Sequence, residues 1–468
     1  MKQLFVGGDL SGIQNFLYNI SSKKAALSLR GRSDYLNTHM CEVYKNIGEK
    51  LSTQKKIYNG GGKFYFITDD TEKNRDEIEK FAKQKNKEIW EEHFGQLAMN
   101  IAYIPFDYVE NGEKQRVKLE NKSEGNIGLL FNAISEKFRK QKQQKFKDLI
   151  LEDYDKFFEP IPVPEKVQVC GVTGIETEKL EECGELKVLP SVKAQIEKGI
   201  EIKADEKNRN EFSDYTEGSY LGVLRMDVDG LGGRFAKGFD NWEEYKVFSH
   251  KLSKFFDREN IQQFFDKDFV ELIYSGGDDI FAVGRWDKVI DFAERLHSEV
   301  DKKFGKEDIH ISGGIVIVND KFPISKSAEL SGKAEDKAKQ NEYNGVKKNS
   351  FTFFNEAVSW TYEFEQIKNH KEKLLNLIDR DEMPKSILHQ IMYYYELSKQ
   401  KENEYKYLWH SAYYITRFMD GKSKEIVDFC TTLRTELAEK KNLKLWAIAS
   451  RWAELLLKDK DKNENNNQ

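Results

Sequence analysis

Four aspartates stand in two short motifs whose spacing could bring them together. The run SGGDD at 275–279 ends in Asp278 and Asp279, and its glycines permit a tight β-turn with these acids at the tip. The run MDVDG places Asp227 and Asp229 at alternate positions where an apolar strand pattern ends, so both point to one face. Carboxylates at neighbouring strand ends form a hard-oxygen site that suits Mg²⁺ or Mn²⁺. The expected metal ligands are Asp227, Asp229, Asp278 and Asp279, and the expected catalytic residues are Asp227, Asp278 and Asp279.

Sites of this kind commonly hold two divalent ions about 3.5–4 Å apart. One ion activates an attacking hydroxyl, and the other neutralises a triphosphate and its leaving group, which is what nucleotidyl transfer requires. An acidic solvated loop is the alternative explanation for Asp278 and Asp279 taken alone. Four acids at strand ends would repel one another in a partly desolvated cleft without a cation, and this favours the metal site.

The two motifs recur in the first half of the chain, which indicates an internal duplication. The run LFVGGDLSGIQNF at 4–16 aligns with GVLRMDVDGLGGRF at 222–235 and places Asp9 on Asp227. IYNGGGKFYFIT and IYSGGDDIFAVG follow these aspartates at nearly the same spacing. Each glycine run precedes a polar helical pattern, an apolar strand pattern and a further helical pattern. Both halves therefore predict an α+β unit whose central strands form a hairpin through the glycines.

The first half lacks most of the acids. Gly62 and Lys63 stand where the second half has Asp278 and Asp279, and Ser11 replaces Asp229. We therefore expect this half to support no chemistry itself, whereas a lysine at the hairpin tip suits a triphosphate. A decayed copy with a purely structural role is the alternative. The expected nucleotide-binding residues are Asp9, Ser11, Gly12, Gly61, Gly62, Lys63, Ser275, Gly276, Gly277 and Lys339.

A basic run and two cysteines are less informative. The run KKAALSLRGRSD at 23–34 holds Arg30 and Arg32, and either a phosphate or RNA patch or a solvated basic face would explain it. Cys170 and Cys183 stand in C-x-x-T and L-x-x-C, so each lacks the second cysteine of a zinc knuckle. We expect no zinc there.

Composition excludes several classes of protein. The chain has 468 residues, and 13% of them are aromatic, which is too many for a disordered chain. Its net charge of −5 shows that the surface as a whole does not attract nucleic acid. No apolar run approaches the roughly 20 residues that span a bilayer, so we expect no membrane contact. Four cysteines cannot staple a chain of this length, which favours the cytoplasm.

The patterns predict five segments. Strand signals vanish beyond residue 360, where helical patterns rich in Glu, Lys, Leu and Tyr begin. Prolines at alternate positions open a different stretch between the halves. The expected segments are the first half at 1–150, an inserted linker with a degenerate zinc-ribbon remnant at 151–215, the second half at 216–358, an all-helical domain at 359–458 and a disordered tail at 459–468.

The run GDLSGIQNFLYNISSKKAALSLRGRSDYL, joined to SGGDD after a second strand-aspartate motif, resembles a known family. It is similar to the large two-palm subunit of type III CRISPR effector complexes, closest to the Csm (III-A) branch, over residues 1 to about 455. SGGDD alone also resembles the turn of diguanylate cyclases, whereas the long N-terminal motif is specific. The resemblance implies two ferredoxin-like palm domains of the nucleotidyl cyclase (GGDEF-like) type and an all-helical C-terminal domain.

The resemblance also implies an activity. In that family the second palm joins ATP molecules into cyclic oligoadenylate once the complex has bound target RNA, and the first palm holds another ATP. These roles carry onto Asp227, Asp278 and Asp279 by motif, and less directly onto Asp229. The implied partners are the other effector subunits, guide RNA and target RNA. Some members use an acceptor other than ATP, so the product stays open.

The family usually begins with an HD nuclease domain. This sequence starts at the first palm and has no His-Asp dipeptide, so no DNase activity is expected. Two other functions remain: a stand-alone dinucleotide cyclase of the diguanylate type, and a catalytically silent scaffold subunit. Cyclases of that type normally work as two identical domains, which the degenerate first half disfavours. The intact Asp227, Asp278 and Asp279 argue against a scaffold.

Overall fold

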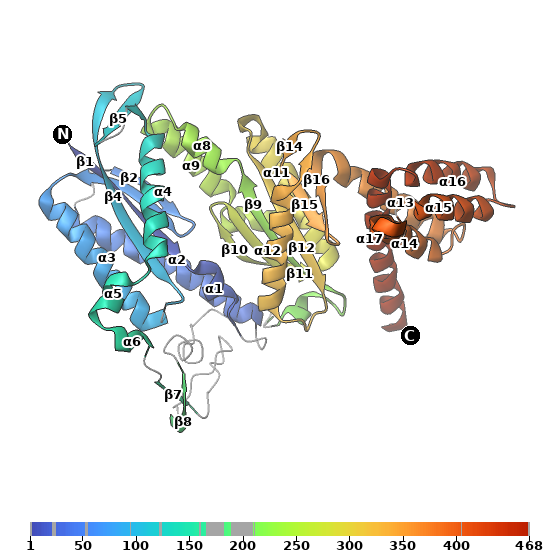
Figure 1. Ribbon diagram of the computed structural model, residues 1–468, viewed down its shortest axis with the longest axis horizontal. Helices are drawn as coiled ribbons and strands as arrows, with labels where there is room; N and C mark the ends of the chain where they lie inside the picture. Colours follow the sequence, from blue (N-terminus) through green and yellow to red (C-terminus); the bar gives the residue numbers. More distant parts are fainter. Residues whose placement is uncertain are drawn as a thin grey trace. The chain divides into compact units, whose positions relative to one another are not determined.

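The chain folds into two units (Figure 1). The computed structural model describes residues 2–20, 25–51, 55–93, 95–120, 124–158, 161–164, 182–188, 209, 211–403 and 405–466. The first unit comprises Met1–Ile311 and Val316–Lys333, and the second comprises Ser312–Ile315 and Ala334–Gln468. The mixed α+β architecture with a helical C-terminal region agrees with the predicted fold class.

The first half forms a six-stranded sheet in the order β2-β3-β1-β4-β5-β6. Its strands are β1 (Gln3–Ser11), β2 (Lys55–Gly60), β3 (Lys63–Asp69), β4 (Ala98–Asn111), β5 (Gln115–Leu119) and β6 (Gly125–Asn126). Its helices are α1 (Ile13–Tyr18), α2 (Ala25–Lys50), α3 (Glu72–His93), α4 (Gly128–Gln143), α5 (Lys147–Glu152) and α6 (Tyr154–Phe158). Helices α3 and α4 both pack on β4, the long strand beside β1.

The second half repeats this order, because its sheet runs β10-β11-β9-β12-β15-β16. Its strands are β9 (Leu221–Asp229), β10 (Val270–Gly276), β11 (Asp279–Arg285), β12 (His310–Val318), β15 (Ser350–Phe353) and β16 (Glu356–Ser359). Its helices are α8 (Leu231–Lys237), α9 (Trp242–Phe255), α10 (Arg258–Ile261), α11 (Trp286–Phe304) and α12 (Ile324–Gln340). Three 3₁₀ turns accompany them: η1 (Phe212–Tyr215), η2 (Gln262–Phe264) and η3 (Gly305–Glu307).

The register of the two hairpins confirms the duplication in detail. The β2–β3 ladder shifts between Lys56 and Tyr58, and the β10–β11 ladder shifts between Leu272 and Tyr274. These irregularities lie at the same distance from each glycine turn. Two copies of one ancestral hairpin explain a matched bulge better than chance does, because bulges are conserved features of a strand pair.

Each half places helices against the sheet of the other half. Helix α2 packs on β10, and helix α9 packs on β2. The ring of Tyr18 lies 4.7 Å from that of Phe281, and the ring of Trp242 lies 5.8 Å from that of Phe5. Buried apolar residues of both halves therefore form one core cluster within the first unit. This exchange of helices locks the two sheets together, and it fixes the two hairpins relative to each other.

The segment between the halves contains two paired strands, β7 (Ile161–Pro164) and β8 (Glu182–Val188). In their antiparallel register Val163 faces Cys183. Cys170 lies outside the described residues. The expected absence of zinc at these two cysteines therefore stays a prediction.

The second unit holds the helical region. It contains the π-helical turn η4 (Trp360–Phe364), α13 (Glu365–Asp379), α14 (Ser386–Lys399), η5 (Lys401–Asn403), α15 (Lys406–Phe418), α16 (Lys424–Leu437), α17 (Lys440–Asn466) and the small strands β13 (Glu342–Tyr343) and β14 (Val346–Lys347). Leucine, isoleucine and tryptophan side chains of α13 to α17 form its core cluster. Among the described helices, none has an apolar stretch long enough to cross a bilayer.

The second unit begins earlier in the chain than the boundary expected at residue 359. The β15–β16 hairpin packs on the helices that follow it. The Lys444 ammonium donates a hydrogen bond to the Ala357 carbonyl (2.9 Å), and the ring of Phe353 lies 5.5 Å from that of Trp452. These contacts join residues far apart in sequence, so composition does not reveal them.

Helix α17 differs from the expectation of a disordered tail from residue 459, because it continues to Asn466. Two ion pairs hold this stretch: Lys385 with Asp461 at 2.9 Å and Lys460 with Asp379 at 3.1 Å. The low-complexity pattern predicted disorder because it shows no apolar periodicity. Charged partners on other helices replace the apolar face here.

Candidate functional site

Three of the four predicted aspartates come together where β9 meets the SGGDD turn. The register of β9 and β11 sets Asp279 opposite Asp227, and Asp278 occupies the turn itself. One carboxylate oxygen from each of Asp227, Asp278 and Asp279 lies within 4.8 Å of the others. All three are half-buried. Three acids this close repel one another in a partly desolvated position, so the donor set fits a divalent cation of the Mg²⁺ or Mn²⁺ kind.

Asp229, the fourth predicted ligand, lies outside this cluster and is only 4% exposed. The ladder between β9 and β11 ends at the pair of Asp227 and Asp279, so Asp229 extends beyond the partner strand. Alternation along β9 predicted a shared face for Asp227 and Asp229. It did not predict where the neighbouring strand would stop.

The same place in the first half has a different chemistry. Lys63 lies opposite Asp9 in the register of β1 and β3, as Asp279 lies opposite Asp227. Asp9 is 4% exposed, and its carboxylate makes an ion pair with the Lys142 ammonium at 2.5 Å. The Lys63 side chain is exposed at the tip of the hairpin. The remaining acid of this half is therefore already neutralised by a lysine that the sequence patterns did not single out.

Ser11 and Gly12 have structural partners. The Ser11 hydroxyl donates to the Ala98 carbonyl (3.1 Å) and accepts from the Asn100 amide (3.2 Å). Gly12 and its counterpart Gly230 have φ of 93° and 80°, and each stands at the turn from a strand into a short helix. A β-carbon on Gly12 would lie 2.0 Å from the Gln96 carbonyl oxygen. The repeated Asp-x-x-Gly spacing thus follows from backbone geometry.

The two glycine hairpins touch at their tips. A β-carbon on Gly61 would lie 3.2 Å from the Gly276 carbonyl oxygen and 3.4 Å from the Gly277 Cα. Gly61, Gly62 and Gly277 all have positive φ, which lets each turn close tightly enough for this approach. The tips of the metal-site half and the lysine half are therefore neighbours within one unit.

Tyrosines lie beneath both hairpins. A β-carbon on Gly60 would lie 3.1 Å from the Tyr58 hydroxyl oxygen, and one on Gly277 would lie 3.4 Å from it. Burial and then the charge of Asp278 raise the pKa of Tyr58 to about 12. Burial, followed by the charges of Asp279 and Asp278, raises the pKa of Tyr274 as well. Both phenols therefore stay protonated beside the acids, and no sequence motif pointed to them.

Several other predicted residues have partners of their own. The Ser275 hydroxyl donates to the Phe256 carbonyl, so it fixes the strand before the turn. A β-carbon on Gly276 would lie 2.1 Å from the Tyr274 hydroxyl oxygen, so a larger residue there would displace the Tyr274 ring. Lys339 lies on α12 in the second unit and forms an ion pair with Glu335 at 2.6 Å. Its role as a nucleotide contact stays a prediction.

The arginines of the basic run have structural roles, which disfavours a nucleic-acid patch there. Arg32 is 5% exposed and donates to the carbonyls of Phe16 and Asn19, and burial lowers its pKa to about 10. Arg30 donates to the Arg209 carbonyl at 2.7 Å. The lysines at 23 and 24 lie outside the described residues.

Comparison with known proteins gives matches over both halves. The model of the Csm1 subunit domain B matches residues 2–160, and the model of the Cas10/Cmr2 second palm domain matches residues 220–352. Both halves resemble Cas10/Csm1 proteins of subtype III-A. A Cas10/Csm1 described as a CRISPR system single-strand-specific deoxyribonuclease in Streptococcus thermophilus is 27% identical, over 90% of this chain and 63% of that protein. A protein of the same description in Enterococcus italicus is 28% identical, over 86% of this chain and 60% of that protein.

Solved structures show the same fold. The Csm1-Csm4 cassette in complex with pppApApA matches with a TM-score of 0.69 at 18% identity, over 97% of this chain and 69% of that chain. The same cassette in complex with cA3 matches with a TM-score of 0.66, over 96% of this chain and 70% of that chain. The chain thus has the Cas10/Csm1 fold, and it spans about three fifths of the length of the two curated Cas10/Csm1 relatives.

Proposed function

We propose that this chain is a metal-dependent nucleotidyltransferase that makes a cyclic oligoadenylate-type second messenger from ATP inside a type III-A effector complex. The observation that carries the proposal is the close approach of Asp227, Asp278 and Asp279 at the tip of the second hairpin. Similarity to Cas10/Csm1 proteins supports it, as does the naming of cA3 and pppApApA as ligands of the similar Csm1-Csm4 cassette. A donor set of three carboxylates is what a nucleotidyl-transfer centre requires.

In this proposal Asp227, Asp278 and Asp279 bind the divalent ions. Bound there, the ions supply a lowered pKa for the attacking hydroxyl and positive charge for the triphosphate. The ribose hydroxyl oxygen of one ATP bonds to the α-phosphorus of another, the bond from that phosphorus to the pyrophosphate oxygen breaks, and pyrophosphate leaves. The hydroxyl proton passes to solvent.

The two halves take different parts in the proposal. The second half binds the ATP that is attacked, because its acids recruit the ions. The first half binds the ATP that supplies the hydroxyl, and the exposed ammonium of Lys63 contacts its phosphates. Contact between the hairpin tips brings the two nucleotide sites together. The neutral hydroxyl of Tyr58 adds a hydrogen-bond donor between them.

Partners form part of the proposal. The similar structures are of Csm1 with Csm4, and one is described as a subcomplex of the type III-A CRISPR-Csm interference complex. We infer that this chain likewise assembles with other effector subunits in the cytoplasm and meets guide RNA and target RNA through them. The proposal does not include nuclease activity. The relatives are described as deoxyribonucleases, but these 468 residues contain no His-Asp dipeptide of the kind expected in an HD nuclease domain.

The assembled complex, purified with guide RNA, tests the function directly. It is incubated with labelled ATP and Mg²⁺, with and without target RNA, and the products are separated by chromatography and identified by mass spectrometry. Cyclic oligoadenylates that appear only with target RNA are expected. A guanine dinucleotide from GTP would favour the stand-alone cyclase, and no product with any nucleotide would favour the silent scaffold.

A further inference from the structure

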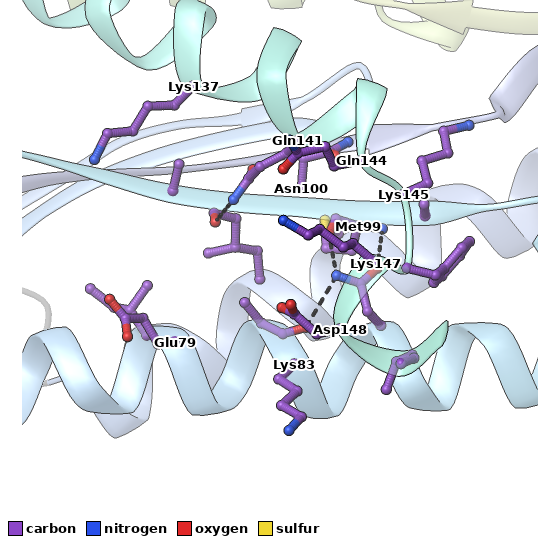
Figure 2. A pocket seen from close by; sticks show the side chains of 18 of the residues that line it. Glu79, Lys83, Met99, Asn100, Lys137, Gln141, Gln144, Lys145, Lys147 and Asp148 are labelled. Atoms are coloured by element: carbon purple, nitrogen blue, oxygen red, sulfur yellow. Dashed lines mark hydrogen bonds between the residues drawn. The ribbon is translucent and has the colours of Figure 1, made fainter. Parts of the chain in front are cut away.

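A cavity of about 650 Å³ lies beside strand β4 in the first half (Figure 2). Helix α3, strand β4 and the end of α4 with the following α5 line it. Its volume is within the roughly 300–1,000 Å³ typical of sites for small organic ligands. None of the residues expected to bind nucleotide at the hairpins lines it.

Both apolar and polar side chains line the cavity. Ile78, Ala82, Met99 and Leu149 line it, and all but the half-buried Ala82 are buried. A flat apolar group fits between such side chains. Gln141 and charged residues line the cavity as well, so an amphipathic ligand fits it.

Gln141 presents an acceptor without a donor. Its Nε2 donates to the Ile101 carbonyl at 2.8 Å, and this acceptor fixes the orientation of the side-chain amide. Its Oε1 is buried and has no hydrogen-bond partner among the described residues. A buried acceptor in this state costs free energy, which a ligand amino or hydroxyl group would offset.

Positive charge dominates the polar lining of the cavity. Five lysines and two acids line the cavity: Lys80, Lys83, Lys137, Lys145 and Lys147 against Glu79 and Asp148. In Figure 2 the side chain of Lys147 reaches into the cavity, whereas that of Lys83 points away from it. Lys83 pairs with Glu152, and Lys147 forms no ion pair with any described residue. The excess of cations favours an anionic ligand.

The second half shows that this space is specific to the first. Gly12 lies against the Gln96 carbonyl just before β4, and Gly230 lies against the Asp308 carbonyl just before β12. Counted from these two contacts along each strand, Ala102 corresponds to Gly314. A β-carbon on Gly314 would lie 2.5 Å from Ala334 on α12, so that helix sits directly against its strand. Ala102 instead lines the cavity. The two halves therefore differ in packing at this position, and the space is found in the half without the metal acids.

We propose that the cavity is a second, non-catalytic site for a nucleoside phosphate. The base lies between the apolar side chains and gives an amino or hydroxyl hydrogen to Gln141, and the phosphate contacts Lys147. The ligand can be a free nucleotide or the end of an oligonucleotide, since both carry this chemistry. This proposal does not rest on the proposed nucleotidyl transfer.

Photolabelling of the full chain with 8-azido-ATP, followed by peptide mapping, tests the proposal. Label is expected on peptides within 78–86, 98–103 and 137–149. Excess AMP and excess triadenylate RNA serve as separate competitors: protection by AMP identifies a free nucleotide as the ligand, and protection by the RNA alone identifies an oligonucleotide. Both outcomes support the site.

The decisive comparison is between two lysines. Lys147→Ala should reduce labelling of the cavity peptides roughly tenfold, as the loss of a charged hydrogen bond implies. Lys140→Ala, on the exposed face of α4 and outside the cavity lining, should not change it. Lys147 is exposed, so its replacement leaves the fold intact. Absence of label on these peptides, or equal labelling of the two variants, would overturn the proposal.

A third variant separates this site from the proposed function. Asp278→Ala with Asp279→Ala should leave labelling of the cavity peptides unchanged even if it removes label near the hairpins. Loss of cavity labelling in that variant would show that one nucleotide site, not two, accounts for the label, and would also overturn the proposal.

Discussion

Lys63 lies directly opposite Asp9 across strands β1 and β3. The same register position in the second half sets Asp279 opposite Asp227. Duplication preserved the backbone geometry of the two hairpins and exchanged an acid for a base at one position. The pair of halves therefore combines a metal-binding tip with a cationic tip, and the two tips touch.

Lys63→Ala should weaken ATP binding without altering dependence on Mn²⁺. Loss of a charged hydrogen bond to phosphate costs roughly 1.5–3 kcal/mol, which is roughly a tenfold to hundredfold loss of affinity. Equilibrium titration of labelled ATP into the full chain, at several Mn²⁺ concentrations, measures both quantities. Lys56→Ala, an exposed lysine on the neighbouring strand, is the matched control. An altered Mn²⁺ requirement in Lys63→Ala would contradict the division between the halves.

The exposed aromatic face of α15 should bind a partner subunit. Trp409 and Tyr413 are 60% and 62% exposed and lie four residues apart on one side of the helix. Exposed aromatic clusters of this kind mark protein contacts, and removing such anchors typically costs 2 kcal/mol or more, about thirtyfold in affinity. Trp409→Ser with Tyr413→Ser should therefore abolish co-purification of a partner effector subunit. Tyr362→Ser, at another exposed ring, is the control, and retained assembly of the double variant would refute the assignment.

His370 should make the helical region sensitive to acid. Its ring stacks on Trp446 at 3.8 Å, and burial lowers its pKa to about 4. The unfolded chain binds a proton near pH 6.5 that the folded chain binds only near pH 4. Stability is therefore full above pH 6.5 and falls as the pH drops from 6.5 towards 4, by at most about 3 kcal/mol.

Thermal unfolding of the full chain across this pH range tests the role of His370. His370→Gln should flatten the acid-side loss of melting temperature, whereas His389→Gln, at an exposed position on α14, should leave the loss as it is. An unchanged pH profile in His370→Gln would show that other groups dominate.

The sequence predicted the parts of the site that depend on local pattern. Motif spacing identified the duplication, the hairpins and the correspondence of Asp9 with Asp227, because strand alternation and glycine turns depend on neighbouring residues. The cluster of Asp227, Asp278 and Asp279 followed from that pattern. Asp229 did not join it, since the end of a ladder depends on the partner strand.

Contacts between distant segments could not be predicted in this way. Lys142 neutralises Asp9 from the end of α4, and Tyr58 lies beside both hairpins because the two glycine turns touch. Arg32 belongs to a run whose pattern predicts a basic face, yet its side chain is buried and donates hydrogen bonds to backbone carbonyls. Each of these depends on packing that no single stretch of sequence encodes.

Metal binding and product formation, measured together on one variant, test the central claim most directly. The account assigns the divalent ions and the chemistry to the same three acids. Asp278→Ala with Asp279→Ala removes mutual repulsion and creates no cavity, so the fold and the assembly should persist. Glu299→Ala, at an acid on α11 whose side chain is 40% exposed and pairs with Lys302, controls for loss of surface charge. In the assembled complex with target RNA, the double variant should lose Mn²⁺ binding by calorimetry and form no oligoadenylate from ATP, while Glu299→Ala keeps both. Near wild-type product from the double variant would contradict the account.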